Sequence, residues 1–490
     1  MKITSPKPQT SHLTINEEAL QKCQSALEKR DRGDYEGARE VMRPLWKRIG
    51  ERPEVKGLHA SVAAEVLICV GILTSWIGSK EELDNAQEVA KDLITEGMTF
   101  YESISDVRKV TSARAEIAYC YFREGALNEA RTQLAEALEK LTTEGNTRAR
   151  ALLRLAIVEC SAFRYDDASK ILTDNAQLFG KVNNHAIIGA YHNQVAMVLR
   201  KLATPQNRND YFQRAIQAYE QADIHFKLAH NIVFRANVKN NVGFLLYKLS
   251  RFKEAHGYLE EARRLAVSIR NKVQTAEIDD TRAQILIAEG RLEEAEAVAS
   301  HAVKVLAKSG QQCLLSDALI TQGIALARLG RIDGAQFAFQ RAIEVAQQVD
   351  ALNKAGLAAL SLVEELDELP RDTVHAAFHR AAEWLANCQS QDLMKRFTAA
   401  AKKVFSILNR ELTAGEATEE LFNKPCDLQK EILRYEGELI NQALARTNGR
   451  LTEAASQLKM SYQALAYIIE RRHKDLLRAR SPVRRRSRRN

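Results

Sequence analysis

The chain has 490 residues, of which 45% are hydrophobic and 27% are charged, a balance that excludes disorder of the whole chain. It contains only eight prolines and 6% aromatic residues, while residues that favour helices abound, so we expect an all-α protein. The net charge of +8 lies at one end, because residues 428–490 hold 15 Lys+Arg against 6 Asp+Glu, whereas residues 1–427 hold 56 against 57. That end predicts a polyanionic partner, and a merely solubilising tail is the alternative.

The N-terminal residues 1–16 are predicted to be disordered, and they lack the apolar core of a signal peptide. The longest apolar run, residues 66–78, covers about two-thirds of a bilayer span, so we expect no membrane segment. The seven cysteines are scattered singly without a C-x-x-C pattern, which favours reduced thiols. These features predict a cytoplasmic protein.

Between residues 17 and 412 the chain repeats itself. The segments 249–266, 289–306 and 329–346 align without a gap, at a period of 40 residues. In most copies two small residues stand twelve positions apart, and a third follows seven positions later. Such spacing suits antiparallel helices that approach closely, because twelve residues lead through a turn onto the next helix and seven residues make two helical turns. We therefore predict eight helical pairs, around Ala38, Ala86, Ala130, Ala168, Ala215, Ala255, Ala295 and Ala335.

This three-point pattern resembles the tetratricopeptide repeat (TPR) over about residues 17–350. The resemblance implies an α-solenoid whose concave face is built mostly from the first helix of each pair. The chain departs from the family in its period of 40, where about 34 is usual, and in Leu45 and Asn175 at the third small position. We expect a degenerate ninth pair across residues 357–385, a capping helix over 392–412 and a linker at 413–427.

Arrays of this kind usually bind extended peptides or partner helices on the concave face. Asparagine suits a peptide backbone, because its amide donates and accepts hydrogen bonds at once. Asn193 and Asn240 occupy equivalent positions of first helices, and Asp280 is next in the series. These three and the flanking residues Lys239 and Asn241 are the candidates for partner binding, with Asn184 and Arg282 also nearby in the sequence pattern. The alternative is that these are exposed helix positions without a ligand.

The sequence contains no motif for catalysis or for a cofactor. It lacks the phosphate-loop pattern G-x-x-x-x-G-K-[ST], the dinucleotide pattern G-x-G-x-x-G and the nucleophile pattern G-x-S-x-G. His375 and His379 are spaced like two metal ligands on a helix, but they lack a neighbouring acid and a third ligand. We therefore expect no enzyme, no cofactor and no metal site.

The C-terminal segment 428–477 predicts a helix-turn-helix domain. An apolar stripe marks its first helix, at Leu428, Ile432, Tyr435, Leu439 and Ala443. This helix is expected to end near residues 448–449, and a second helix over 451–458 leads through the turn 459–460 into a third helix capped by Ser461. The stripe must be covered, and one possibility is that it packs on its own chain, for example on the end of the solenoid. The other is the dimer contact that the family resemblance described next implies.

The segment resembles the Fis-type helix-turn-helix of bacterial regulators. The matching positions are Thr447, Gly449, Arg450, Ala454, Ala455, Leu458, Lys459, Met460, Ser461, Ala464 and Leu465. The resemblance implies a DNA-binding homodimer whose third helix enters the major groove, with Leu465 and Ile469 facing inward. Arg450 stands where Asn is usual and Lys459 where a turn Gly is usual, and the third helix lacks the basic residues that the family tends to carry near its start.

Gln463 is the predicted base contact, because its amide can pair with the N6 and N7 atoms of adenine. Tyr462 and Tyr467 are expected to meet phosphate or a thymine methyl group. The other predicted DNA contacts are Arg450, Lys459, Ser461, Arg471, Arg472, Lys474, Arg478, Arg480, Arg484, Arg485 and Arg486. The last of these lie in an Arg-rich tail, residues 478–490, which suits RNA equally well.

The sequence as a whole predicts a bacterial cytoplasmic transcriptional regulator, associated with the nucleoid when it binds DNA. Its solenoid would sense or recruit a protein or peptide, while the C-terminal domain and tail hold DNA as a homodimer. The alternative is an interaction scaffold whose basic end binds RNA or an acidic protein without sequence preference.

Overall fold

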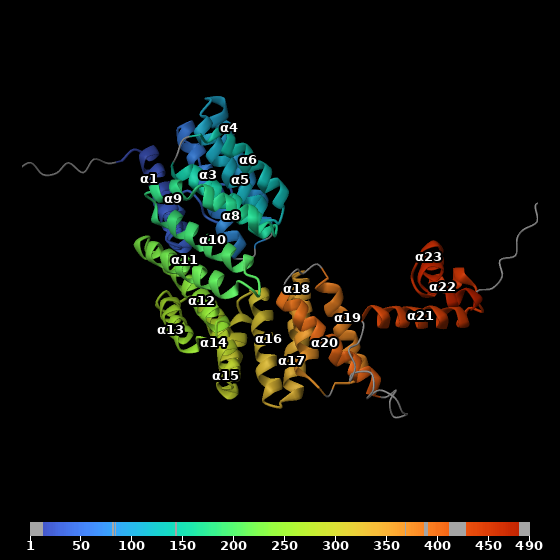
Figure 1. Ribbon diagram of the computed structural model, residues 1–490. Coiled ribbons are helices and arrows are strands. Elements are labelled where there is room, and N and C mark those ends of the chain that lie inside the picture. Colours follow the sequence, from blue (N-terminus) through green and yellow to red (C-terminus); the bar gives the residue numbers. More distant parts are fainter. Residues whose placement is uncertain are drawn as a thin grey trace, which may run out of the picture. The chain divides into compact units, whose positions relative to one another are not determined.

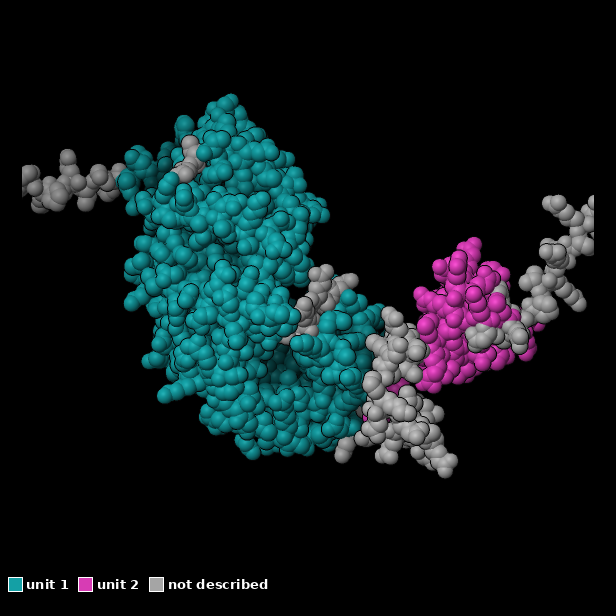
Figure 2. Space-filling view, viewed as in Figure 1, with its two compact units in different colours: residues 1–404 teal, residues 405–490 magenta. Residues whose placement is uncertain are grey.

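The computed structural model describes residues 13–80, 83, 85–142, 145–367, 369–386, 391–410 and 428–479. The chain divides into two compact units, residues 1–404 and 405–490, which Figures 1 and 2 show. All regular structure in the described residues is helical, which confirms the predicted all-α class.

Unit 1 is built from nine helical pairs, followed in the described chain by the single helix α20 (Gln391–Arg410). The first helices are α1 (Ile15–Asp31), α3 (Ala60–Lys80), α5 (Val107–Arg123), α7 (Asn146–Ser161), α10 (His185–Leu202), α12 (Ile232–Lys248), α14 (Lys272–Ala288), α16 (Gln312–Arg328) and α18 (Leu352–Glu365). The second helices are α2 (Tyr35–Met42), α4 (Ala86–Ser103), α6 (Leu127–Lys140), α8 (Tyr165–Asp174), α11 (Arg208–Leu228), α13 (Phe252–Ser268), α15 (Leu292–Leu306), α17 (Ile332–Gln348) and α19 (Arg371–Trp384). The eight predicted pairs and the degenerate ninth are therefore confirmed.

The small residues of the repeat lie where paired helices touch. Ala255 and Ala262 of α13 and their counterparts Ala295 and Ala302 of α15 are completely buried. A side chain on Gly243 of α12 would come within 2.7 Å of Leu259 on the partner helix. Only small residues let the helix axes approach this closely, which is why the sequence repeats them.

The period of 40 consists of two equal halves. Between residues 230 and 350 a residue with left-handed backbone ends every helix at intervals of 20, at His230, Ser250, Arg270, Gly290, Gly310, Gly330 and Asp350. The φ angles at these positions lie between 53° and 78°. Each helix plus its turn thus takes 20 residues. The sequence hides this regularity, because only three of the seven positions carry the glycine that such a backbone favours.

The two departures from the repeat pattern coincide with two shortened second helices. Where Leu45 replaces a small residue, α2 has already ended at Met42, and Trp46 is buried beneath the irregular segment that follows. Where Asn175 replaces one, α8 ends, and the short helix α9 (Ala176–Lys181) follows it. A side chain too large for the close contact therefore marks the end of the helix.

The helix α3 is longer and more apolar than the sequence analysis predicts. Residues 60–78 form a stretch of 19 residues with mean hydropathy 1.9, which by length and composition alone could cross a membrane. However, 67% of its 18-residue window is buried inside the unit, where Val66, Val70 and Leu73 pack with the first pair. This burial is typical of the core helix of a helical array.

Unit 2 contains the predicted helix-turn-helix. Its helices are α21 (Leu428–Arg446), α22 (Leu451–Gln457) and α23 (Tyr462–Arg472), followed by the 3-10 helix η1 (Lys474–Ala479). Its core joins all four helices through Ile440, Leu444, Ala454, Leu465, Ile469 and Leu476.

Candidate nucleic-acid interface

The first helix of unit 2 ends at the predicted place. Asn448 and Gly449 both adopt left-handed backbone, with φ angles of 49° and 74°, and the Gly449 amide donates to the Leu444 carbonyl at 2.8 Å. The Thr447 hydroxyl donates to the Ala443 carbonyl at 2.8 Å. These bonds satisfy carbonyls that the helix end leaves free, and they turn the chain into α22.

The turn between α22 and α23 is tight. Ala454 and Ala455 of α22 are at most 2% exposed, so α23 packs directly on the backbone of α22. Lys459 takes a left-handed conformation with φ of 53°, which explains why related sequences place glycine there. The lysine thereby accepts backbone strain of about 1 kcal/mol, while its exposed ammonium adds a positive charge to the turn.

Ser461 caps α23 as predicted, because its hydroxyl accepts a hydrogen bond from the Ala464 amide at 3.1 Å. Leu465 and Ile469 are completely buried, which confirms the predicted inner face. The opposite face presents Gln463 and Tyr467 to solvent, and Tyr467 is 62% exposed. A helix that shows polar and aromatic side chains from its first turn is the arrangement by which helix-turn-helix proteins contact base edges.

Positive charge gathers beyond the first turns of α23. Arg471, Arg472 and Lys474 are exposed, and the Arg471 guanidinium lies 5.9 Å from the centre of the Tyr467 ring. Arg472 also lies 3.2 Å from Glu436, whose half-buried carboxylate leaves the outer part of the guanidinium exposed.

Two other predicted contacts lie near the start of α22 and of α23. Arg450 forms an exposed ion pair with Glu453 at 2.9 Å, and Tyr462 is 47% exposed. Arg478 lies in η1, but its side chain, like Arg480, Arg484, Arg485 and Arg486, lies outside the described residues.

One contact that the sequence analysis missed ties the end of α23, just before η1, to α21. His473 is buried, and its Nε2 atom lies 2.9 Å from a carboxylate oxygen of Glu436. A side chain at Gly437 would come within 2.9 Å of the His473 ring. An isolated glycine inside an otherwise helical pattern was the available signal for this close approach.

The stripe on α21 is only partly confirmed. Ala443 packs in the domain core, but Tyr435 and Leu439 are 59% and 40% exposed, and Ile440 and Leu444 make the core contacts instead. The Leu428 and Ile432 side chains lie outside the described residues. Tyr435 and Leu439 thus leave an apolar surface on α21 that the domain itself does not cover.

The candidate partner residues of the solenoid fall into different surroundings. Asn240, Asn241 and Asp280 line one cavity of about 310 Å3. Three carboxylates, Glu277, Asp280 and Asp317, face one arginine, Arg200, in its wall, and we call it the acidic cavity. Burial raises the pKa of Asp280 to about 7, and it also raises the pKa of Glu277. The Oδ1 atoms of Asn240 and Asp280 are buried and have no hydrogen-bond partner in the part of the chain that the structure describes.

The remaining candidates do not line the acidic cavity. Asn193 lines a smaller cavity of about 180 Å3, which is closer to the N-terminus of unit 1 in the sequence. Lys239 joins α12 to its neighbours, because its ammonium lies 3.2 Å from Asp223 and 2.7 Å from Glu261. The flanking residue Asn184 caps α10 by accepting a hydrogen bond from the Ile187 amide, so its role is structural.

Comparisons with known proteins agree with both units. Residues 434–471 match the family model described as "Bacterial regulatory protein, Fis family". No curated protein is detectably similar to the chain.

Among solved structures, the chain is similar to a signal-transduction ATPase of the STAND class with a tetratricopeptide repeat sensor, from Pyrococcus horikoshii. The TM-score is 0.51 at 14% identity, over 75% of this chain and 55% of that one. A Rap protein complexed with competence and sporulation factor gives 0.48 at 12% identity, over 69% of this chain and 97% of that one. The apo quorum sensor NprR from B. thuringiensis gives 0.45 at 15% identity, over 69% and 98%.

The first of these similarities supports the repeat fold alone, since identity is low and the chain spans about half of the ATPase. The family match covers most of the domain that α21, α22 and α23 form. The chain therefore joins a TPR-like helical solenoid to a C-terminal helix-turn-helix domain of the Fis family of bacterial regulatory proteins.

Proposed function

We propose that the protein is a DNA-binding transcriptional regulator without enzymatic activity, in which the solenoid binds a protein or peptide partner. The observation that carries this proposal is the outer face of α23. Gln463 is exposed in the first turn, and Arg471, Arg472 and Lys474 follow where the chain leaves the helix.

This arrangement divides the interaction between two kinds of contact. Gln463 offers a bidentate amide to one base pair, which supplies specificity at one position. The arginines and Lys474 meet phosphates, which supply affinity on any sequence. The first turn of α23 offers one amide and no exposed arginine. We therefore expect contacts with the DNA phosphates to contribute more to binding than contacts with the bases.

We further propose that the protein binds DNA as a homodimer through α21. Tyr435 and Leu439 are one helical turn apart and both are exposed, so a second copy of the helix would bury them. Two copies would place two α23 helices on successive major grooves of a two-fold symmetric site.

The acidic cavity is the proposed partner site of the solenoid. Asn240 holds an unfilled acceptor atom there, and an N–H group of a bound peptide would fill it. Asn240→Ala should weaken capture of the partner, whereas Asn193→Ala, which changes a residue outside the acidic cavity, should not. Unchanged capture of every partner by the Asn240 variant would remove this site from the proposal.

A salt-titrated gel-shift assay tests DNA binding. Full-length protein is compared with the chain ended at residue 427, with Arg471→Ala/Arg472→Ala and with Gln463→Ala. We expect the shortened chain to lose binding, the double variant to bind every sequence more weakly with a salt slope lower by about two, and Gln463→Ala to lose preference at one position.

The matched control is Lys253→Ala/Arg264→Ala, which removes two exposed positive charges from α13 and should leave binding unchanged. Undiminished affinity without residues 428–490 would refute the proposal. Equal affinity of the full chain for random DNA and random RNA would favour the scaffold function instead.

A further inference from the structure

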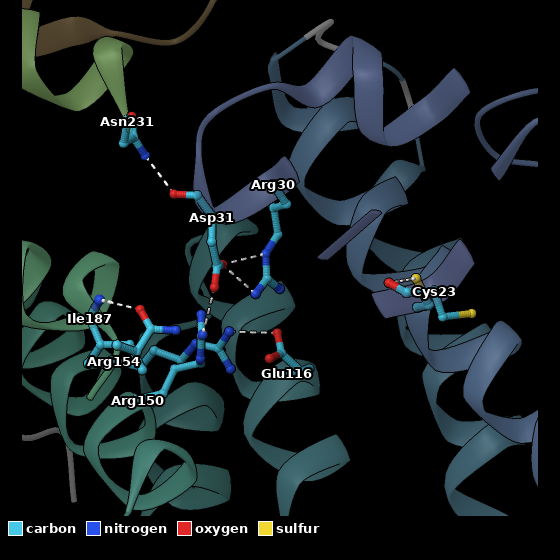
Figure 3. A network of polar contacts seen from close by, with 10 residues as sticks. Cys23, Arg30, Asp31, Glu116, Arg150, Arg154, Ile187 and Asn231 are labelled. Carbon is cyan, nitrogen blue, oxygen red and sulfur yellow. Dashed lines mark hydrogen bonds and ion pairs between the residues drawn. The ribbon is translucent and has the colours of Figure 1, made fainter. Parts of the chain in front are cut away.

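Within unit 1 the turn after α1 contacts the beginning of α12, 200 residues further along the chain. The Asn231 amide donates to the Asp31 carbonyl at 2.8 Å, and Asn231 is only 1% exposed (Figure 3). A side chain at Gly33 would come within 3.1 Å of Asn231, so the glycine permits the contact. The contact encloses a cavity of about 180 Å3, which we call the chamber, between helices of the first six pairs.

The polar wall of the chamber carries more positive than negative charge. The Arg30 and Arg150 guanidinium groups share the Asp31 carboxylate, at 2.7 Å and 3.3 Å. The Arg154 guanidinium pairs with Glu116 at 2.6 Å. Three cations thus face two anions, and one positive charge is left uncompensated (Figure 3).

Arg150 is the cation with the weakest pairing. Its 3.3 Å contact is the longest of the three, and burial together with the charge of Arg30 lowers its pKa. It lines both the chamber and a larger neighbouring cavity, so it keeps donors free for a ligand. A partly desolvated charge of this kind is stabilised strongly when an anion supplies the missing hydrogen bonds.

Two residues that line the chamber carry a buried donor for which the described residues offer no good acceptor. Gln194 is 4% exposed, and its Nε2 atom has no hydrogen-bond partner among the residues that the structure describes. Burial raises the pKa of the Cys160 thiol, and a contact with the Gln194 amide counteracts part of that rise. Sulfur is a weak acceptor, so this contact satisfies the amide poorly. The Trp76 Nε1 atom is likewise buried without a partner in the described chain. These unfilled donors, unlike the unfilled acceptors of the acidic cavity, call for a ligand with oxygen acceptors.

The rest of the wall is mainly apolar or aromatic, although Asn193 and Asn231 also line it. Leu153, Ile157, Phe226 and Phe234 line the chamber, and the ring of Trp76 stacks on its neighbours at one side. An inorganic ion would leave these walls uncovered, whereas an anion with an apolar or aromatic body would cover them.

We propose that the chamber binds a small organic anion, whose carboxylate or phosphate oxygens accept hydrogen bonds from Arg150 and Gln194 while its apolar body lies against Phe226 and its neighbours. This site is separate from the acidic cavity, and it does not depend on DNA binding. It would give the solenoid a ligand of its own besides a protein partner.

Thermal unfolding of the full-length protein tests the proposal, with benzoate and phenyl phosphate as probes, uncharged benzamide as the matched probe, and ionic strength held constant. We expect one or both anions to raise the unfolding temperature saturably, and benzamide to have no effect. A larger effect of benzoate identifies a carboxylate site, and a larger effect of phenyl phosphate identifies a phosphate site.

Arg150→Gln should abolish the response to the anions, while Arg148→Gln on the same helix should preserve it, because Arg148 donates instead to the Leu138 carbonyl at 3.0 Å. The Arg150 variant should fold, since Arg30 still pairs with Asp31. If circular dichroism shows that it does not, Gln194→Leu takes its place. No response of the wild type to either anion, or an equal response of wild type and the chamber variant, overturns the proposal.

Discussion

Two neighbouring aspartates of α14 should respond in opposite ways to the same substitution. The Asp279 carboxylate accepts hydrogen bonds from Arg263 and Arg282, both at 2.9 Å. The Asp280 carboxylate accepts one from Gln284 at 2.9 Å, while its second oxygen is buried without a partner among the described residues. Both side chains are less than a tenth exposed, so the difference between them lies in the pairing of the charge.

The magnitude follows from the pKa of Asp280. Burial, with added repulsion from Asp317 and Glu277, raises it from an ordinary 3.8 to about 7. At 1.36 kcal/mol for each unit, the charged form of Asp280 weakens the folded state by about 4 kcal/mol. Because the folded protein holds a proton that the unfolded chain releases, the penalty is absent below pH 4, grows as the pH rises, and is complete above pH 7.

Asp280→Asn should therefore stabilise the protein at pH 8, by up to about 4 kcal/mol, and should have little effect near pH 4. Asp279→Asn is the matched control, since it leaves two arginines without their shared anion. It should destabilise the protein by about 3 kcal/mol at pH 8.

The assay is urea unfolding followed by circular dichroism, between pH 4 and pH 8. Solenoids can unfold in more than one step, so the midpoint of the transition is compared rather than a fitted two-state free energy. If Asp280→Asn lowers the midpoint at pH 8, or shifts it equally at every pH, then Asp280 is a paired anion and the reasoning is wrong.

Three predictions concern the C-terminal unit. Lys459→Gly should slow hydrogen exchange in α22 and α23, because it relieves about 1 kcal/mol of strain at a left-handed backbone position. The same change should weaken DNA binding, because it removes a positive charge. Faster exchange in the variant would contradict the presence of strain. Tyr435→Ser with Leu439→Ser should convert a dimer into a monomer in sedimentation velocity, whereas an unchanged mass at equal concentration would place the dimer contact elsewhere. Gly437→Ala should displace the His473 ring and speed exchange in η1, and unchanged protection would show that the ring has room to move.

The sequence predicts the fold well where the packing rule is local. Two helices that must touch need small residues at fixed offsets, and a printed sequence shows these directly, as at Gly243 and Ala255. The same holds for the helix-turn-helix, where Ala454, Ser461 and Leu465 each meet a requirement that involves neighbours within about a dozen residues. The exposed face of α23 follows from these positions by helical geometry.

The sequence does not predict contacts that depend on the curvature of the array. The contact of Asn231 with Asp31 depends on the summed rotations between six successive helical pairs. No local sequence pattern encodes that sum. For the same reason Arg150 looks like an ordinary charged helix residue in the sequence, although it lines two cavities. Lys239 flanks a repeated position but forms ion pairs between neighbouring helices.

The polar residues that conflict with burial are the ones that point to function. An array of this kind needs only small and apolar residues inside, so Arg150, Gln194, Asn240 and Asp280 each make the folded state less stable than an apolar residue of similar size would. They lie at two cavities of different chemistry. Among the described residues, Gln194 Nε2 is an unpartnered donor at the chamber, whereas Asn240 Oδ1 is an unpartnered acceptor at the acidic cavity. The two proposed sites therefore suit different ligands, and each ligand would offset part of the stability that its polar residues cost.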